Sequence, residues 1–186
     1  MRMTQSAFDA TGFFRFDLAN GSIKSREGEQ LALIPVDLLD GLEPGEQTKR
    51  SSMAFGKTHG KRFAEIIAQL EEPPGVEILA DHLGGLTAVF GLGRSAVEIR
   101  GNAILFRLKS GREMSDGVVT LLTGFLAGFM SEIEPETTFE ILHMQTDDDG
   151  DLFWAGNPKA IDQVKDWLAD GVKPMEALWL LSEEGR

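Results

Sequence analysis

The stretch Gly117–Ile133, GVVTLLTGFLAGFMSEI, contains no charged residue before Glu132, and its apolar residues recur at helical spacing. One broad stripe consists of Val118, Leu121, Leu122, Phe125, Phe129 and Ile133, and Leu126 and Met130 widen it. The uncharged run is shorter than the roughly 20 residues that a membrane-spanning helix needs. It therefore predicts a core helix that is buried on most of its circumference.

Two pairs of glycines lie at one-turn spacing within predicted helices. Gly124 and Gly128 belong to the core helix, and Gly56 and Gly60 lie on the apolar seam of a second helix, expected over about residues 46–71. Each glycine costs about 1 kcal/mol of helix stability relative to alanine. Either the two helices cross glycine face to glycine face at close range, or each pair makes room for a bulky side chain or a ligand.

The composition of the 186 residues is that of a soluble globular domain, with 42% hydrophobic and 26% charged residues. The absence of cysteine excludes disulfides and thiolate chemistry. The net charge of −12 argues against nucleic acid or an anionic membrane surface as a partner. We find no signal peptide and no membrane span, so the expected location is the cytoplasm.

The remaining pattern alternates helices with antiparallel hairpins. Strands are expected at 13–18, 31–36, 95–100, 103–109, 137–145 and 151–155, and further helices at 36–42, from Pro158 to Gly171, and at 174–181. Residues 83–92 are interpreted as a glycine-rich link with some helical content, mainly a turn region, because GGLTAVFGLG lacks the features of a phosphate-binding loop. This order predicts an α+β fold, with an antiparallel sheet and helices packed on one face.

Candidate catalytic and metal-binding residues are few. His59, His82 and His143 lie on different elements; His59 is expected at the surface, and His143 as a satisfied core or interface group. The carboxylates of Asp147–Asp149 and Asp151 lack the spacing of a calcium loop, and Asp149-Gly150 predicts a hairpin turn. No nucleophile motif is present, so no metal, no cofactor and no catalytic residue is predicted.

Four segments resemble the 4-vinyl-reductase domain family, a group of predicted hydrocarbon-binding proteins related in fold to small subunits of the TRAPP tethering complexes. They are LALIPVDLLDGL at 31–42, FGKTHGKRFAEII at 55–67, VFGLGRSAVEI at 89–99 and TLLTGFLAGFMSEI at 120–133. The resemblance covers roughly residues 12–156. We therefore expect one domain over 1–156 and a C-terminal helical extension, 157–186, packed on it.

The resemblance implies a homodimer with a small apolar-ligand pocket beside the central helix. Many members also bind zinc through a glutamate and two cysteines. The chain has His143, Thr146 and Trp154 at these positions, so the zinc site is expected to be lost, with Trp154 as a large replacement in the hairpin.

Two functional hypotheses follow. The first is a non-catalytic ligand-binding or sensory domain whose pocket is lined by Phe63, Leu122, Phe125, Phe129 and Trp154; the same side chains could instead simply fill the core. The second is an interaction module like the tethering-complex subunits, with a filled interior and an acidic C-terminal docking surface around Trp167 and Trp179. The family's name alone suggests a third, an enzyme acting on a tetrapyrrole vinyl group. A cavity beside the glycine pairs would favour the first hypothesis.

Overall fold

The computed structural model describes residues 14–17, 22–25, 28, 30–32, 36–70, 75–100 and 103–184. Six helices and seven strands lie in these ranges. The helices are α1 (Val36–Leu39), α2 (Glu46–Ile67), α3 (Val76–Val89), α4 (Asp116–Ile133), α5 (Pro158–Ala169) and α6 (Pro174–Glu184). The strands are β1 (Phe14–Asp17), β2 (Ser22–Ser25), β3 (Gln30–Leu31), β4 (Arg94–Arg100), β5 (Ala103–Lys109), β6 (Glu140–Asp147) and β7 (Gly150–Gly156).

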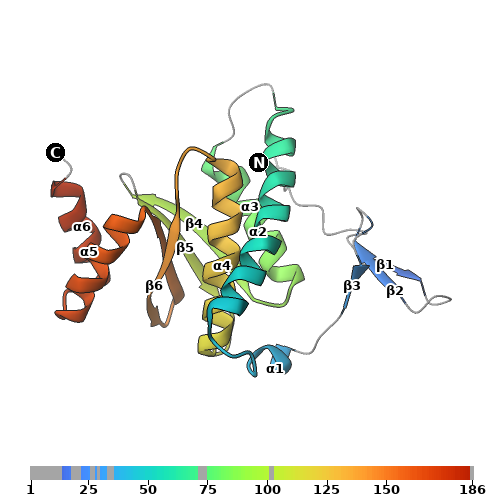
Figure 1. Cartoon of the computed structure of the whole chain (residues 1–186), viewed down its shortest axis with the longest axis horizontal. Coiled ribbons are helices and arrows are strands. Elements are labelled where there is room, and N and C mark those ends of the chain that lie inside the picture. Colours follow the sequence, from blue (N-terminus) through green and yellow to red (C-terminus); the bar gives the residue numbers. More distant parts are fainter. Residues whose placement is uncertain are drawn as a thin grey trace, which may run out of the picture.

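The main sheet has four antiparallel strands in the order β4-β5-β7-β6. Its side chains alternate between two hydrophobic clusters, as the period of two in a strand requires. On β5 and β7, Phe106 and Phe153 belong to the cluster under α2, α3 and α4, whereas Leu105 and Trp154 belong to a cluster under α5 and α6. The sheet is therefore covered on both faces, with α5 and α6 on one side and the other large helices on the opposite side (Figure 1).

The central helix α4 matches the predicted core helix closely. Its N-cap is Ser115, whose side chain accepts a hydrogen bond from the Val118 N–H. Ten of its 18 residues are buried. By length and composition α4 is the one helix among the described residues that could cross a membrane, but a buried core helix passes the same test. Here it packs against α2 and β6.

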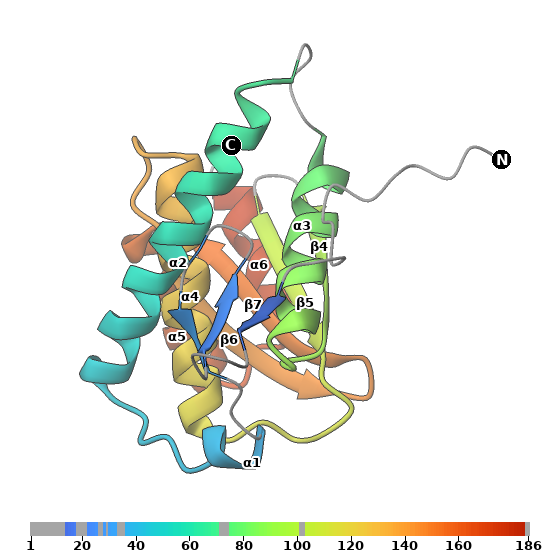
Figure 2. The ribbon, with the colours of Figure 1, turned by 90° about the vertical axis from the view of Figure 1, so that its right-hand side faces the viewer.

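The helices α2 and α4 lie side by side (Figures 1 and 2), and their backbones approach at the four glycines. A Cβ added at Gly56 would meet the main chain of Phe125 and Phe129, and one added at Gly128 would meet the main chain of Met53 and Lys57. As the contacts advance from residue 49 to residue 60 along α2, they advance from residue 124 to residue 132 along α4. The two helices are therefore parallel, and the glycines of each helix lie against the main chain of the other.

The segment 83–92 has more helix than expected, and its interpretation as mainly a turn region is wrong. α3 runs through Gly84 and Gly85 to Val89, and only Gly91 and Gly93, both with positive φ, belong to the turn into β4. A Cβ at Gly84 would lie 3.3 Å from the Ser95 carbonyl oxygen, so the glycine faces β4, on which α3 packs. Close packing on the sheet thus outweighs the low helix propensity of glycine.

The N-terminal strands form a separate antiparallel sheet in the order β1-β2-β3, which lies on the outer side of the layer that contains α2 and α3 (Figure 2). The strand expected at 31–36 is shorter in the structure, where β3 is Gln30–Leu31. Residues 33–35 lie outside the described residues. The residues that join β1 to β2 (18–21) and β4 to β5 (101–102) lie outside them as well. The predicted fold class, α+β with an antiparallel sheet and packed helices, is confirmed. Helices were expected on one face of the sheet, whereas α5 and α6 also cover the second face.

Candidate functional site

A cavity of about 650 Å³ lies between the N-terminal half of α2, the C-terminal end of α3 and the middle of α4. The segment from β3 to the turn after α1 contributes a fourth wall through Leu31, Ala32, Leu39 and Leu42. Ligand-binding pockets commonly measure about 300–1,000 Å³ and are mostly apolar. The cavity is therefore of the size and character that a small-molecule site requires.

The floor and the mouth of the cavity are distinguished by exposure. Phe125 of α4 is buried, as is Leu92 in the turn after α3, so both belong to the floor. Gln47, Ser51 and Phe55 of α2 also line the cavity and are exposed. Ala32 and Gly91 line the cavity and are exposed as well, so the mouth lies between the first turns of α2 and these two residues.

The polar groups of the cavity are neutral, and three of their hydroxyls donate to main-chain carbonyl oxygens. Thr48 Oγ1 donates to the Glu43 carbonyl oxygen at 2.9 Å, Ser52 Oγ to that of Lys49 at 3.0 Å, and Thr87 Oγ1 to that of Leu83 at 3.0 Å. No described residue that lines the cavity carries a charge. These three hydroxyls therefore present mainly lone pairs to the cavity. Gln47 and Ser51 also line it, and there the Gln47 amide donates to the Ser51 hydroxyl at 3.5 Å.

His59 lies at the inner side of the cavity, and the expectation that it is a surface residue is wrong. Its side chain is 4% exposed. Its ring centroid lies 4.6 Å from that of Phe55, 5.7 Å from that of Phe90 and 6.2 Å from that of Phe125. All three phenylalanines line the cavity, so His59 supports its aromatic wall from behind.

His82 of α3 is the second buried histidine next to this aromatic group. Its ring lies 4.7 Å from Phe63 and 6.0 Å from Phe129, centroid to centroid. Burial, with a smaller contribution from the nearby His59, lowers the pKa of His82 from 6.5 to about 4. His82 is therefore neutral at pH 7 and acts as an aromatic packing group.

The five residues predicted to line a pocket lie in different places. Phe125 lines the cavity. Phe63, Leu122 and Phe129 are buried in the same hydrophobic cluster as Phe125, but they do not reach the cavity surface. Trp154 points to the opposite face of the sheet and packs with Ile161 and Val164 of α5, because an even-numbered residue of β7 faces that side.

Most of the wall residues were missed by the sequence analysis. Leu39 and Leu42 belong to the short helix predicted at 36–42, and Val89 and Leu92 to the segment interpreted as a turn region. Their signal was present as apolar residues next to glycines, but only the fold brings the segments together.

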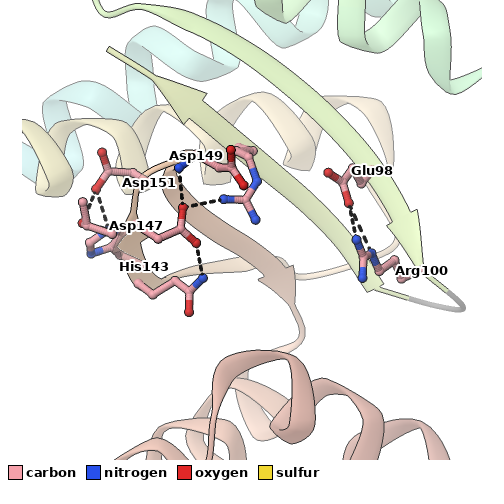
Figure 3. Close-up of polar contacts among 9 residues, drawn as sticks. Glu98, Arg100, His143, Asp147, Asp149 and Asp151 are labelled. Carbon is pink, nitrogen blue, oxygen red and sulfur yellow. Dashed lines mark hydrogen bonds and ion pairs between the residues drawn. The ribbon is translucent and has the colours of Figure 1, made fainter. Parts of the chain in front are cut away.

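A polar network joins β6 and β7 at the end of the sheet (Figure 3). His143 Nε2 lies 3.0 Å from Asp151 Oδ1, and Thr146 Oγ1 donates to the same oxygen at 2.6 Å. Asp151 is 3% exposed, so these two partners satisfy a buried carboxylate. His143 has a hydrogen-bond partner, as expected. That partner, Asp151, is eight residues away across the hairpin.

The same hairpin carries the acidic run that invited a calcium interpretation. β6 ends at Asp147 and β7 begins at Gly150, whose φ is +110°. Asp147 Oδ1 pairs with Arg107 at 3.1 Å and accepts the Asp149 N–H at 2.9 Å. Across the part of the chain that the structure describes, no three His, Cys, Asp or Glu side chains come together as a metal-binding group.

Comparison with known proteins shows a likeness of fold to solved structures. No model of a protein family matches the chain. No curated protein matches it in sequence. Its structure is similar to that of the phenol-responsive sensory domain of the transcription activator PoxR, solved with phenol, with a TM-score of 0.51 and 15% sequence identity. The match covers 80% of this chain and 90% of the PoxR chain. At this identity the likeness establishes a shared fold.

Proposed function

We propose that this chain is a non-catalytic domain that binds a small apolar molecule in the cavity between α2, α3 and α4, and that binding serves a sensory role. The observation that carries the proposal is the 650 Å³ cavity with its uncharged, largely apolar wall. A filled interior would have favoured an interaction module instead. The fold shared with a phenol-responsive sensory domain supports the same assignment.

The finer parts of the proposal concern family and assembly. The resemblance to the 4-vinyl-reductase domain family implies a homodimer without the zinc site, and we include both in the proposal. The His143–Asp151–Thr146 network is consistent with a hairpin held by hydrogen bonds in place of a metal. Sedimentation of the purified protein measures the oligomeric state, and a monomer at all concentrations would refute the dimer.

The experiment for the ligand site uses two tryptophan substitutions on α2. Ser51 lines the cavity, whereas Ala54, also exposed and less than one turn away, does not. Ser51→Trp should fill the mouth, and Ala54→Trp is the matched control. The probes are phenol, toluene and naphthalene, measured by calorimetry and by thermal shift.

We expect at least one probe to stabilise the wild type and Ala54→Trp, and to lose its effect on Ser51→Trp. A probe at one hundred times its Kd stabilises the folded state by about 2.7 kcal/mol, which raises the Tm of a domain of this size by about 5–10 °C. If no probe binds the wild type, or if both variants bind equally well, the cavity is not the site.

One observation favours an interaction module as a second candidate. On α6, Trp179 is 60% exposed and Met175 36% exposed, while Ala177 and Leu178 are buried against the sheet. Exposed large apolar side chains in one place are typical of protein–protein contacts. Trp179→Ser should abolish capture of a specific partner under this candidate and leave probe binding in the cavity unchanged.

A further inference from the structure

The polar side of the cavity comes almost entirely from the first two turns of α2. Gln47, Thr48, Ser51 and Ser52 are adjacent on one face of this helix, and the other walls are apolar apart from Thr87. A ligand that fills the cavity thus meets a narrow polar strip on one side and hydrocarbon elsewhere.

The inner residues of this polar strip, Thr48 and Ser52, offer hydrogen-bond acceptors, whereas the donors of the strip, the Gln47 amide and the Ser51 hydroxyl, lie at its exposed edge. Thr48 and Ser52 have donated their hydroxyl protons to the carbonyl oxygens of Glu43 and Lys49. Their remaining lone pairs can only accept. A ligand group that donates can pair with the Thr48 hydroxyl, whereas one that only accepts, such as an ether or a ketone, gains no hydrogen bond there and must turn to the exposed Gln47 or Ser51.

The charge of the ligand follows from the same wall. A carboxylate or sulfonate would lose its hydration on entering and would find no cationic side chain among the described lining residues. Burial of an unpaired charge is strongly unfavourable. The cavity therefore selects neutral molecules.

The volume sets a lower limit on the size of the ligand. At 650 Å³ the cavity lies in the middle of the range for drug-sized ligands, about 300–1,000 Å³. A one-ring molecule would leave most of the apolar wall uncovered. The affinity grows with the apolar area removed from water, so a larger molecule is favoured.

We infer that the ligand is a neutral, largely apolar molecule of two or more rings, or of equivalent length, whose hydroxyl or amine donates a hydrogen bond to the Thr48 hydroxyl. This inference rests on the proposed function and adds the ligand class. It differs in size from phenol, the compound found with the PoxR sensory domain.

The test compares four probes on the wild-type chain by calorimetry. 2-Naphthol carries a donor, 2-methoxynaphthalene replaces it with an acceptor, 2-naphthoate is an anion, and phenol has one ring. We expect 2-naphthol to bind about five- to tenfold more tightly than the methyl ether, as one hydrogen bond gives. It should bind at least about tenfold more tightly than phenol because of its second ring. 2-Naphthoate should not bind measurably.

The role of Thr48 is tested with a matched pair of substitutions. Thr58 also lies on α2 and donates its hydroxyl to a carbonyl oxygen, that of Ala54 at 3.2 Å, but it does not line the cavity. Thr48→Val should abolish the preference for 2-naphthol over its methyl ether, whereas Thr58→Val should retain it. Thr48→Ser, which keeps the hydroxyl, should restore the preference.

The possible failures are distinguishable. Equal affinity of 2-naphthol and 2-methoxynaphthalene for the wild type overturns the donor assignment, and equal affinity of phenol and 2-naphthol overturns the size assignment, while the proposed function stands in both cases. If none of the four probes binds, the proposed function fails and the inference fails with it. The comparisons on the wild type decide these points even if Thr48→Val does not fold.

Discussion

The substitution Gly56→Ala tests whether α2 and α4 are held by backbone-to-backbone packing. A Cβ at this position would lie 2.9 Å from the carbonyl carbon of Phe125, closer still to its oxygen, and 3.0 Å from the Phe129 nitrogen. Carbon atoms in favourable contact are about 3.5–4.0 Å apart. All three opposing atoms belong to the main chain of a buried helix, so they cannot rotate away and the two helices must separate.

The magnitude follows from two opposing effects. Overpacking of a tight core costs about 1–3 kcal/mol, and the main-chain character of this overlap favours the upper end. Alanine returns about 1 kcal/mol of helix propensity. The net loss is about 2 kcal/mol of unfolding free energy, which corresponds to a decrease of about 4–8 °C in Tm for a chain of this length.

The assay is calorimetric melting, with urea unfolding as an independent measure of stability. Gly84→Ala is the matched control, since Gly84 is also helical but its Cβ would lie at 3.3 Å from a single carbonyl oxygen. Gly84→Ala should keep or slightly raise the Tm. A Gly56→Ala protein as stable as the wild type, or equal shifts in the two variants, would refute the packing argument.

Three further predictions concern other parts of the chain. Because burial lowers the pKa of His82 from 6.5 to about 4, the unfolded state binds more protons than the folded state between these pH values. The contribution of His82 to the free energy of unfolding is therefore complete above pH 6.5 and falls by about 3 kcal/mol on acidification to pH 4. Urea unfolding at several pH values should show that this loss disappears in His82→Phe. Ile161→Ala truncates a fully buried side chain of α5 and should cost about 2–5 kcal/mol of unfolding free energy. Because α5 lies on the other face of the sheet, calorimetry should find the probe affinity of the cavity unchanged, and a loss of affinity in the folded variant would contradict this separation. Asp40→Asn breaks the exposed ion pair with Arg112, 2.6 Å long, and should cost at most about 1 kcal/mol, with no difference from the wild type when unfolding is repeated at high salt.

The parts of the fold with strong local signals were predictable from the sequence. α4 and the hairpin of β4 and β5 lie within a residue or two of their expected bounds, because apolar periodicity and turn residues agree there. α3 was missed because Gly84 and Gly85 weaken the helical signal locally, whereas the helix is stabilised by its packing on β4.

The site was less predictable, because its walls come from separate segments. The periodicity of α2 identifies the seam that faces α4, but not the second face, on which His59 meets Phe90 after the end of α3. The pairing of His143 with Asp151 depends on strand register, including the irregularity between His143 and Gln145. Neither relation can be obtained from spacing along the chain.

The parallel pairing of α2 with α4 has a consequence for the kinetics of folding. The two helices are separated in the sequence by α3, β4 and β5, so their contact is non-local and closes a long loop. The glycines that allow this contact also weaken each helix in isolation. The pair should therefore form late, after the β4–β5 hairpin, and contacts that span such long sequence separations are associated with slow folding. The cavity, which needs both helices, would be completed in the same late step.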